Sequence, residues 1–301
     1  IDLGENTLTV GGLFLTYYKN AHLVQEGDKV VLKAEEQTDN IYAGVADTAN
    51  SMAGANLIWE AARHGSVDQA VTDFLAALND DMVNNPSAAR RSLAAAAGST
   101  VTSLGIAQRD ALRDQMNWIR NRTNQMGVNP AYVNADLPYF HMWMQGTGSY
   151  AKLDTRGDES GYQLTTWGGT VGMDVDLSDH FTMGAAFTAN YGDLTASAAD
   201  SADGHLDSYY ANLFGRYQSK RWAHTLILTG GWNDAKLNRT VNYGAGSYGT
   251  QGNTNGWGFG AMYELTYDVY LNEDRSSILQ PLVNASVVTT RMDGYTETGA
   301  G

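Results

Sequence analysis

An alternation of apolar and small polar residues runs through the second half of the chain, from about residue 140 onward. In segment 167–177, one row carries Trp167, Val171, Met173, Val175 and Leu177, and the facing row carries only glycine, threonine and aspartate. A repeat of two residues places the two rows on opposite faces of a β-strand. Each strand is therefore expected to separate an apolar environment from a polar one.

The composition of the polar row distinguishes between two folds that such strands can build. In a soluble β-sandwich this row faces water and usually carries lysine and glutamate, whereas here it is rich in Gly, Thr, Ser, Asn and Asp. Tyrosine and tryptophan gather near the ends of the segments. Lipid-facing apolar rows, lumen-facing polar rows and aromatic girdles are typical of a transmembrane antiparallel β-barrel. We therefore predict a mainly β chain of that class.

Composition bears on several other classes of protein. The formal net charge of −14 argues against a nucleic-acid-binding surface, because phosphate contacts need a basic face. There is no run of about 18 apolar residues that could form a transmembrane helix. The lack of cysteine fits a chain that crosses an oxidising periplasm. Because its first residues show no signal-peptide pattern, the chain is expected to be an excised or processed piece.

Two segments precede the long helix and the barrel. Residues 1–45 contain short strand-like runs, and the stretch from Gly4 to Val10 resembles one rung of a β-helix. Residues 46–98 form a helical linker region, with helices expected at 53–63, 67–78 and 88–97. Ser66 and Ser87 are the expected N-caps of the second and third helices, and Gly98 the residue that ends the third.

The longest helix is expected within residues 99–130, and it carries an unusual number of cations and amides. The residues that we select are Arg109, Arg113, Asn117 and Arg120. An ordinary solvated helix accounts for them, and so does a plug inside a hydrophilic pore. In the second case the lumen-facing acids Asp174, Asp176, Glu264 and Asp268 would attract the arginines, and partial desolvation would strengthen each pair.

Residues 131–301 give seven strands, and this number poses a problem. The expected strands are 139–155, 162–177, 181–195, 205–219, 221–238, 254–271 and 277–292. Bacterial single-chain barrels have an even number of strands. An open edge in hydrocarbon leaves backbone groups unsatisfied at several kcal/mol each. The sequence therefore predicts a partial barrel, or one whose edges are covered by something else.

The whole arrangement resembles an autotransporter of the type V secretion system. The residues that carry the resemblance are the β-helix-like start, the linker segment Leu93 to Gly98 followed by Arg109, Arg120 and Arg122, and the barrel opening from Trp143 to Tyr150. The resemblance implies a 12-stranded barrel whose pore holds the linker helix. It also implies a final strand with a terminal aromatic residue, which this chain lacks together with about five strands.

What the resemblance implies about function is an outer-membrane translocator of a Gram-negative bacterium that anchors and secretes an N-terminal passenger. The implied partners are outer-membrane lipid, the β-barrel insertion (BAM) machinery and the chain's own passenger domain. The missing strands make a truncated assembly intermediate, held by that machinery, a live interpretation. No nucleic acid, cofactor or metal is expected.

No catalytic motif supports an enzyme. The six histidines are scattered without metal-ligand spacing, and phosphate-loop, Gly-x-Ser-x-Gly and His-Glu-x-x-His patterns are absent. Passenger release by cyclisation of Asn117, Asn121 or Asn124 is disfavoured, because the paired asparagines, Asn84 and Asn85, lie outside the long helix. Two other functions stay open: a small porin or adhesin-like barrel that binds ligands through its loops, and a soluble secreted β-protein.

Overall fold

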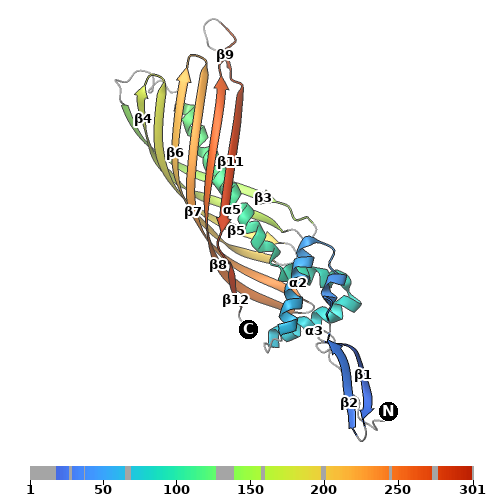
Figure 1. Ribbon diagram of the computed structural model, residues 1–301. Helices are drawn as coiled ribbons and strands as arrows, with labels where there is room; N and C mark the ends of the chain where they lie inside the picture. The colour runs from blue at the N-terminus through green and yellow to red at the C-terminus, as the bar shows by residue number, and fades with distance from the viewer. Residues whose placement is uncertain are drawn as a thin grey trace.

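A long curved sheet holds one helix along its concave side (Figure 1). The computed structural model describes residues 18–26, 29–36, 38–64, 69–126, 139–156, 160–197, 201–243, 246–272 and 277–299. The strand order is β11-β8-β7-β6-β5-β4-β3, and neighbouring strands are antiparallel. The long strands are thus ordered in space as they are in the sequence, which is the topology of an up-and-down barrel wall.

The strands begin and end close to the predicted positions. They are β3 (Tyr139–Leu153), β4 (Gly161–Ser178), β5 (Phe181–Ser197), β6 (Ser201–Ser219), β7 (Trp222–Tyr243), β8 (Gly246–Tyr267) and β11 (Leu282–Met292). The short β12 (Thr296–Gly299) also pairs with β8, beyond β11. Between β8 and β11, the chain forms a small hairpin of β9 (Val269–Tyr270) and β10 (Ile278–Leu279).

Two of the predicted strand boundaries were wrong. Segment 239–253 was expected to be a loop, but the β7–β8 ladder runs through it to the pair Tyr243 and Gly246. Its threonines, valine and tyrosines favour a strand, and this preference outweighs that of its glycines for a turn. The seventh strand begins at Leu282 rather than at residue 277, because residues 278–279 pair back with β9.

The two rows predicted for the alternating strands are confirmed. On β4, Trp167, Val171 and Met173 point away from the helix and are 50–61% exposed. Asp174 and Asp176 face the concave side and are 1% and 5% exposed. The wall therefore presents apolar side chains outward and polar ones inward over this part of its length.

The outward row changes character at one level of the sheet. Aromatic side chains form a girdle there, and their strand-to-strand pairing is given by Trp167 with Tyr191, Tyr209 with Trp232, and Trp232 with Trp257. Beyond the girdle, toward α2–α4, the outward positions become polar: Gln163, Thr165, Asp193, Thr195, His205, Asp207, Lys236 and Asn253. This girdle marks one boundary of the apolar band, and the strands continue past it.

Inward positions also change at this level. On the lipid side of the girdle they combine polar residues with apolar ones such as Phe214 and Ile227, and beyond it most of the buried inward residues are apolar. The apolar ones beyond the girdle include Tyr162, Leu164, Leu194, Leu206 and Leu237. The ladders between β4 and β7 run through this level without a register shift. The apolar positions therefore change face because of the order of the residues, and not because of a bulge in the backbone.

Three helices form a separate core at the end of the sheet beyond the girdle (Figure 1). They are α2 (Ala49–His64), α3 (Gln69–Asn84) and α4 (Pro86–Ala96), preceded by the 3-10 helix η1 (Ile41–Gly44). Tyr42, Trp59, Leu75, Leu78 and Leu93 are the large members of this core, each at most 6% exposed. We call α2–α4 with η1 the helical cap.

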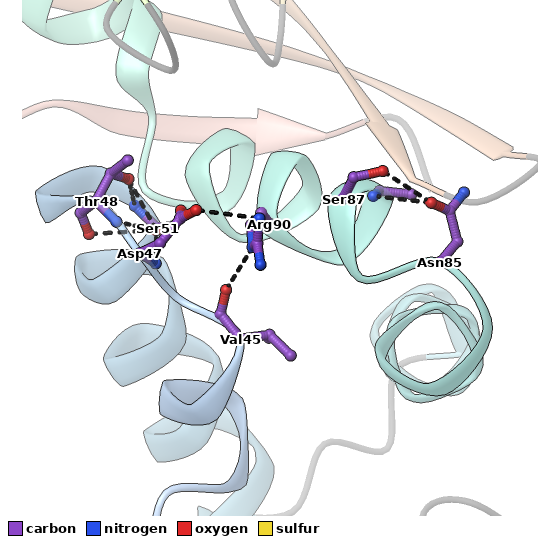
Figure 2. Close-up of polar contacts among 8 residues, drawn as sticks. Val45, Asp47, Thr48, Ser51, Asn85, Ser87 and Arg90 are labelled. Carbon is purple, nitrogen blue, oxygen red and sulfur yellow. Dashed lines mark hydrogen bonds and ion pairs between the residues drawn. The ribbon is translucent and has the colours of Figure 1, made fainter.

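Local hydrogen bonds fix the turns of the helical cap (Figure 2). Asn85, rather than the expected Ser87, is the N-cap of α4, because its side chain accepts from the backbone of Ala88 and Pro86 follows at N1. Gly98 adopts a φ of +71° after α4, as predicted for a residue that ends a helix. The predicted cap Ser66 lies outside the described residues.

A second contact in Figure 2 ties the start of α2 to α4. Arg90 pairs with Asp47 at 3.1 Å and donates from Nε to the carbonyl oxygen of Val45 at 3.0 Å. Thr48 and Ser51 form reciprocal hydrogen bonds at the first turn of α2. These contacts are partly exposed and add little stability individually, but they fix the direction in which the chain enters the cap.

The described N-terminal residues form an antiparallel hairpin of β1 (Tyr18–Glu26) and β2 (Lys29–Glu36). Successive rungs of a β-helix pair in parallel, and the stretch from Gly4 to Val10 lies outside the described residues. The assignment of residues 1–45 to a β-helical passenger therefore stays a prediction. Among the described residues, none of the helices is long and apolar enough to cross a bilayer.

Candidate functional site: the helix-filled lumen

A row of glycines on β8 packs against helix α5 (Ser99–Met126). Gly256, Gly258 and Gly260 face inward on alternate positions, and a Cβ atom built on each would lie 2.9 Å from Gln108 Oε1, 2.9 Å from Leu112 Cδ2 and 2.7 Å from Met116 Sδ, respectively. Those helix residues are spaced by four, so they form one stripe along α5. The stripe and the glycine row thus run side by side, and the backbone of β8 approaches the helix closely.

Charged groups concentrate around the C-terminal turns of α5. Arg122 pairs with Asp174 at 3.2 Å, and His141 Nδ1 lies 3.1 Å from the same carboxylate. The guanidinium of Arg122 also lies over the ring of Trp143, at 5.1 Å from its centroid. A buried carboxylate without such partners would cost several kcal/mol, so these residues fix the helix at this level.

A second charged group lies nearby on other strands. Glu264, 1% exposed, accepts from Asn124 Nδ2 at 3.0 Å and lies 3.7 Å from Arg120 Nε. Arg216 of β6 donates to Asn124 Oδ1 at 3.0 Å. Together with the Arg122 group, these contacts join α5 to β3, β4, β6 and β8. We call the two groups the ionic layer.

Closer to the N-terminus of α5, polar side chains of the wall hydrogen-bond to the helix. Gln115 donates to Thr188 Oγ1 at 2.8 Å, and Thr188 is 2.8 Å from the hydroxyl of Thr170. All three residues are at most 3% exposed. Nearer the helical cap, Tyr162 donates to Asp110 at 2.6 Å. Polar contacts of this kind orient the helix without an ion pair.

Apolar side chains of β4 to β7 pack against the first turns of α5, at the level beyond the girdle. They are four leucines, one from each of β4 to β7, and two helix residues: Leu164, Leu194, Leu206, Leu237, Leu104 and Ala107. None is more than 2% exposed. We call this group the leucine collar.

The helical cap is joined to the wall by Arg239 of β7. Its Nη1 donates to the carbonyl oxygen of Ala95, in the last turn of α4, at 2.6 Å. Its Nε donates to Glu297 of β12 at 2.6 Å, and Nη2 pairs with the other oxygen of that carboxylate. A cation at a helix C-terminus is favourable, and the fork-shaped pair with Glu297 holds it there.

Comparison with known proteins decides the family. The model of the autotransporter β-domain matches residues 142–301, which is more than half of the chain. The chain belongs to the autotransporter β-domain family. Proteins of this family are outer-membrane proteins of Gram-negative bacteria, and the β-domain acts as a translocator rather than as a catalyst.

Several relatives share this part of the chain. The esterases EstA of Pseudomonas aeruginosa and Pseudomonas putida are each 37% identical over 147 residues, which is 48% of this chain and 22% of each esterase. An extracellular serine protease of Serratia marcescens is 29% identical over 108 residues, 35% of this chain and 10% of the protease. The chain thus spans less than a quarter of the length of these relatives.

The autotransporter β-domain brings some of the selected residues together and leaves others apart. Arg120 reaches Glu264, while Asp174 and Asp176 lie within 4.0 Å of His141. Arg109 pairs with Asp110 of its own helix, and Arg113 is exposed. Asn117 is half-buried. Asp268 lies past the end of β8, where its carboxylate accepts from Gln280 at 2.6 Å.

Other residues of the ionic layer were not selected from the sequence. Arg122 was noted only within the family resemblance, His141 was treated as an isolated histidine, and Arg216 was not considered. A sequence signal existed for Arg122: from Arg120 it lies 200° around the helix, so the pair reaches opposite walls of a narrow lumen. For Arg216, its inward parity on β6 was the available signal.

Proposed function

We propose that this chain is the C-terminal translocation unit of an autotransporter. It inserts into the outer membrane, provides the route by which an N-terminal passenger reaches the cell surface, and anchors that passenger. Helix α5 then occupies the lumen. The observation that supports this most directly is the ionic layer, where arginines of α5 meet buried acids on β4 and β8.

The orientation follows from the two ends of the sheet. The turns at Asp179–His180 and Lys220–Arg221 are two residues long, as periplasmic turns of outer-membrane barrels usually are. The opposite end carries the helical cap and the chain leading back toward the passenger (Figure 1). We therefore assign the cap, and the strand ends beyond the girdle, to the extracellular side.

The edges of the sheet call for a partner. In the described part of the chain, one edge of β3 and the outer edge of β11 pair with no strand. Unsatisfied backbone groups in hydrocarbon cost several kcal/mol each. We propose that further strands of the full-length protein close this gap, and that a form without them remains bound to the insertion machinery as an assembly intermediate. Passenger activity is not specified by this part of the protein.

The plug is tested by single-channel conductance of the full-length protein in planar bilayers. Replacing Arg120 and Arg122 together by serine removes the arginine of α5 beside each of two buried acids, Glu264 and Asp174, a loss of about 3–5 kcal/mol per broken pair. Conductance is expected to rise because α5 is held less firmly in the lumen. The matched control is Arg109→Ser, which removes an exposed pair within the helix. Equal conductance in all three proteins would contradict the plug, and a high conductance in the unmodified protein would favour an open porin.

A further inference from the structure

The packing of the leucine collar shows how four adjacent strands build an apolar arc against α5. Leu206 lies opposite Gly192 of β5, and Leu237 lies opposite Gly204 of β6. A Cβ atom at Gly192 would come within 3.0 Å of Leu164 Cδ1, and one at Gly204 within 2.0 Å of a backbone oxygen. Gly192 therefore leaves room for Leu164, and Gly204 allows the backbone of β7 to come close. The leucines belong to the same buried cluster as Leu104 of α5.

The layers below the collar are mixed in character. The Gln115, Thr188 and Thr170 contacts and the ionic layer are formed by hydrogen-bonding groups, which also bind water and ions. They lie beside a second apolar group that includes Met116, Phe214 and Ile227. A polar lumen with a helix in it can still conduct through hydrated gaps. An apolar constriction excludes water, and an ion has to lose its hydration shell in order to pass.

We propose that the leucine collar is the β4–β7 side of an apolar seal of the plugged lumen, and that this seal lies on the extracellular side of the lipid band. The ionic layer positions α5, while the collar blocks water and ions. This inference rests on the proposed function, because it requires α5 to lie inside the lumen. It assigns a sealing role to Leu104, Leu164, Leu194, Leu206 and Leu237.

These 301 residues contain no cysteine, so a thiol introduced here is the only one in this part of the protein. Thr188→Cys puts a reporter in the polar layer beneath the collar. Cells that produce the full-length protein are treated from outside with a charged, membrane-impermeant thiol reagent. The reporter is expected to stay unlabelled with the collar intact, and to be labelled severalfold faster when Leu206→Ser or Leu104→Ser is added.

The matched control is Leu112→Ser, which truncates an equally buried leucine of α5 outside the collar. It is expected to leave the reporter unlabelled. Labelling of the reporter with the collar intact would overturn the proposal. So would equal labelling in the Leu112→Ser protein, or none in either collar variant.

A cross-linking test separates this inference from the proposed function. Gln115→Cys combined with Thr188→Cys replaces two side chains whose ends touch at 2.8 Å, so a short bifunctional thiol reagent is expected to join α5 to the wall. Failure to cross-link in the otherwise unmodified protein shows that α5 is not in the lumen, and both proposals fall. If the cross-link forms but the reporter thiol is labelled at the same rate with and without the collar substitutions, the collar proposal alone is overturned. Cross-linking in the Leu206→Ser background also shows that this variant has folded.

Discussion

At the scale of single residues, three glycines of β8 determine how closely α5 approaches the wall. Gly256, Gly258 and Gly260 alternate with Trp257 and Phe259, and this alternation places them on the lumen side of β8. The alternation did not indicate that α5 fills the space beside these glycines, because that depends on which stripe of a distant helix packs against β8. The structure supplies this through the stripe that contains Leu112 and Met116.

Gly258→Val is expected to displace α5, because its Cβ atom would lie 2.9 Å from Leu112 Cδ2. Overpacking of this kind costs about 1–3 kcal/mol. The control is Gly230→Val on the adjacent strand β7, where an added Cβ meets no atom within 4 Å. Urea unfolding of the detergent-solubilised protein, followed by tryptophan fluorescence, measures both. A similar loss of stability in the two variants would show that α5 does not rest on the glycine row.

At the scale of elements, strand positions were predictable and the inversion of their faces was not. Alternation has a period of two whichever row is apolar, so a count of alternating residues continues unchanged when the rows exchange roles. On β4 the apolar positions move from odd numbers, such as Trp167, to even ones, Leu164 and Tyr162. This change of phase was visible in the sequence, and it was the available sign that the strand leaves the lipid.

The ionic layer was predicted in kind but only partly in membership. Arginines of a long helix and acids of the wall were the right residue types. Which arginine meets which acid depends on the rotation of α5 within the lumen, and a helix with polar residues around its whole circumference does not specify that rotation. Arg113 accordingly lies on the exposed side, while Arg122, on a different side of α5 from Leu112, pairs with Asp174.

Arg239→Ala is expected to loosen the helical cap from the wall. Glu297 loses its partner in a partly buried site, and the carbonyl oxygen of Ala95 loses a donor, so we expect a loss of about 3–5 kcal/mol. Limited proteolysis of intact cells should cut within the helical cap sooner. Lys236→Ala, an exposed change on the same strand, provides the comparison. Unchanged cleavage in the Arg239→Ala protein would mean that the cap is held by other contacts.

At the scale of the whole molecule, the length of the outward apolar rows gives the thickness of the membrane-spanning part. On β5 the apolar row extends from Phe181 to Tyr191, about 33 Å along a strand at 3.3 Å per residue. With the usual tilt this spans about 25 Å of membrane. The remaining residues of β5, up to Ser197, and the paired ends of β7 and β8 then stand in water.

A charge added to the outward row tests this depth assignment. Ala185→Arg places a cation near the middle of the band and is expected to cost about 2–4 kcal/mol, whereas Thr195→Arg, on the same face of the same strand beyond the girdle, should cost about 0–1 kcal/mol. Folding equilibria in lipid vesicles, measured by urea titration, compare the two. Equal costs would contradict the position given to the girdle.

The helix that fills the lumen is covalently continuous with the strands that surround it, because α5 is followed in the same chain by β3. A helix that is joined to its own barrel wall in this way can fill that barrel and cannot be exchanged between molecules. Each molecule would therefore export a single cargo, its own, and the number of exported domains on a cell would equal the number of wall domains in its membrane.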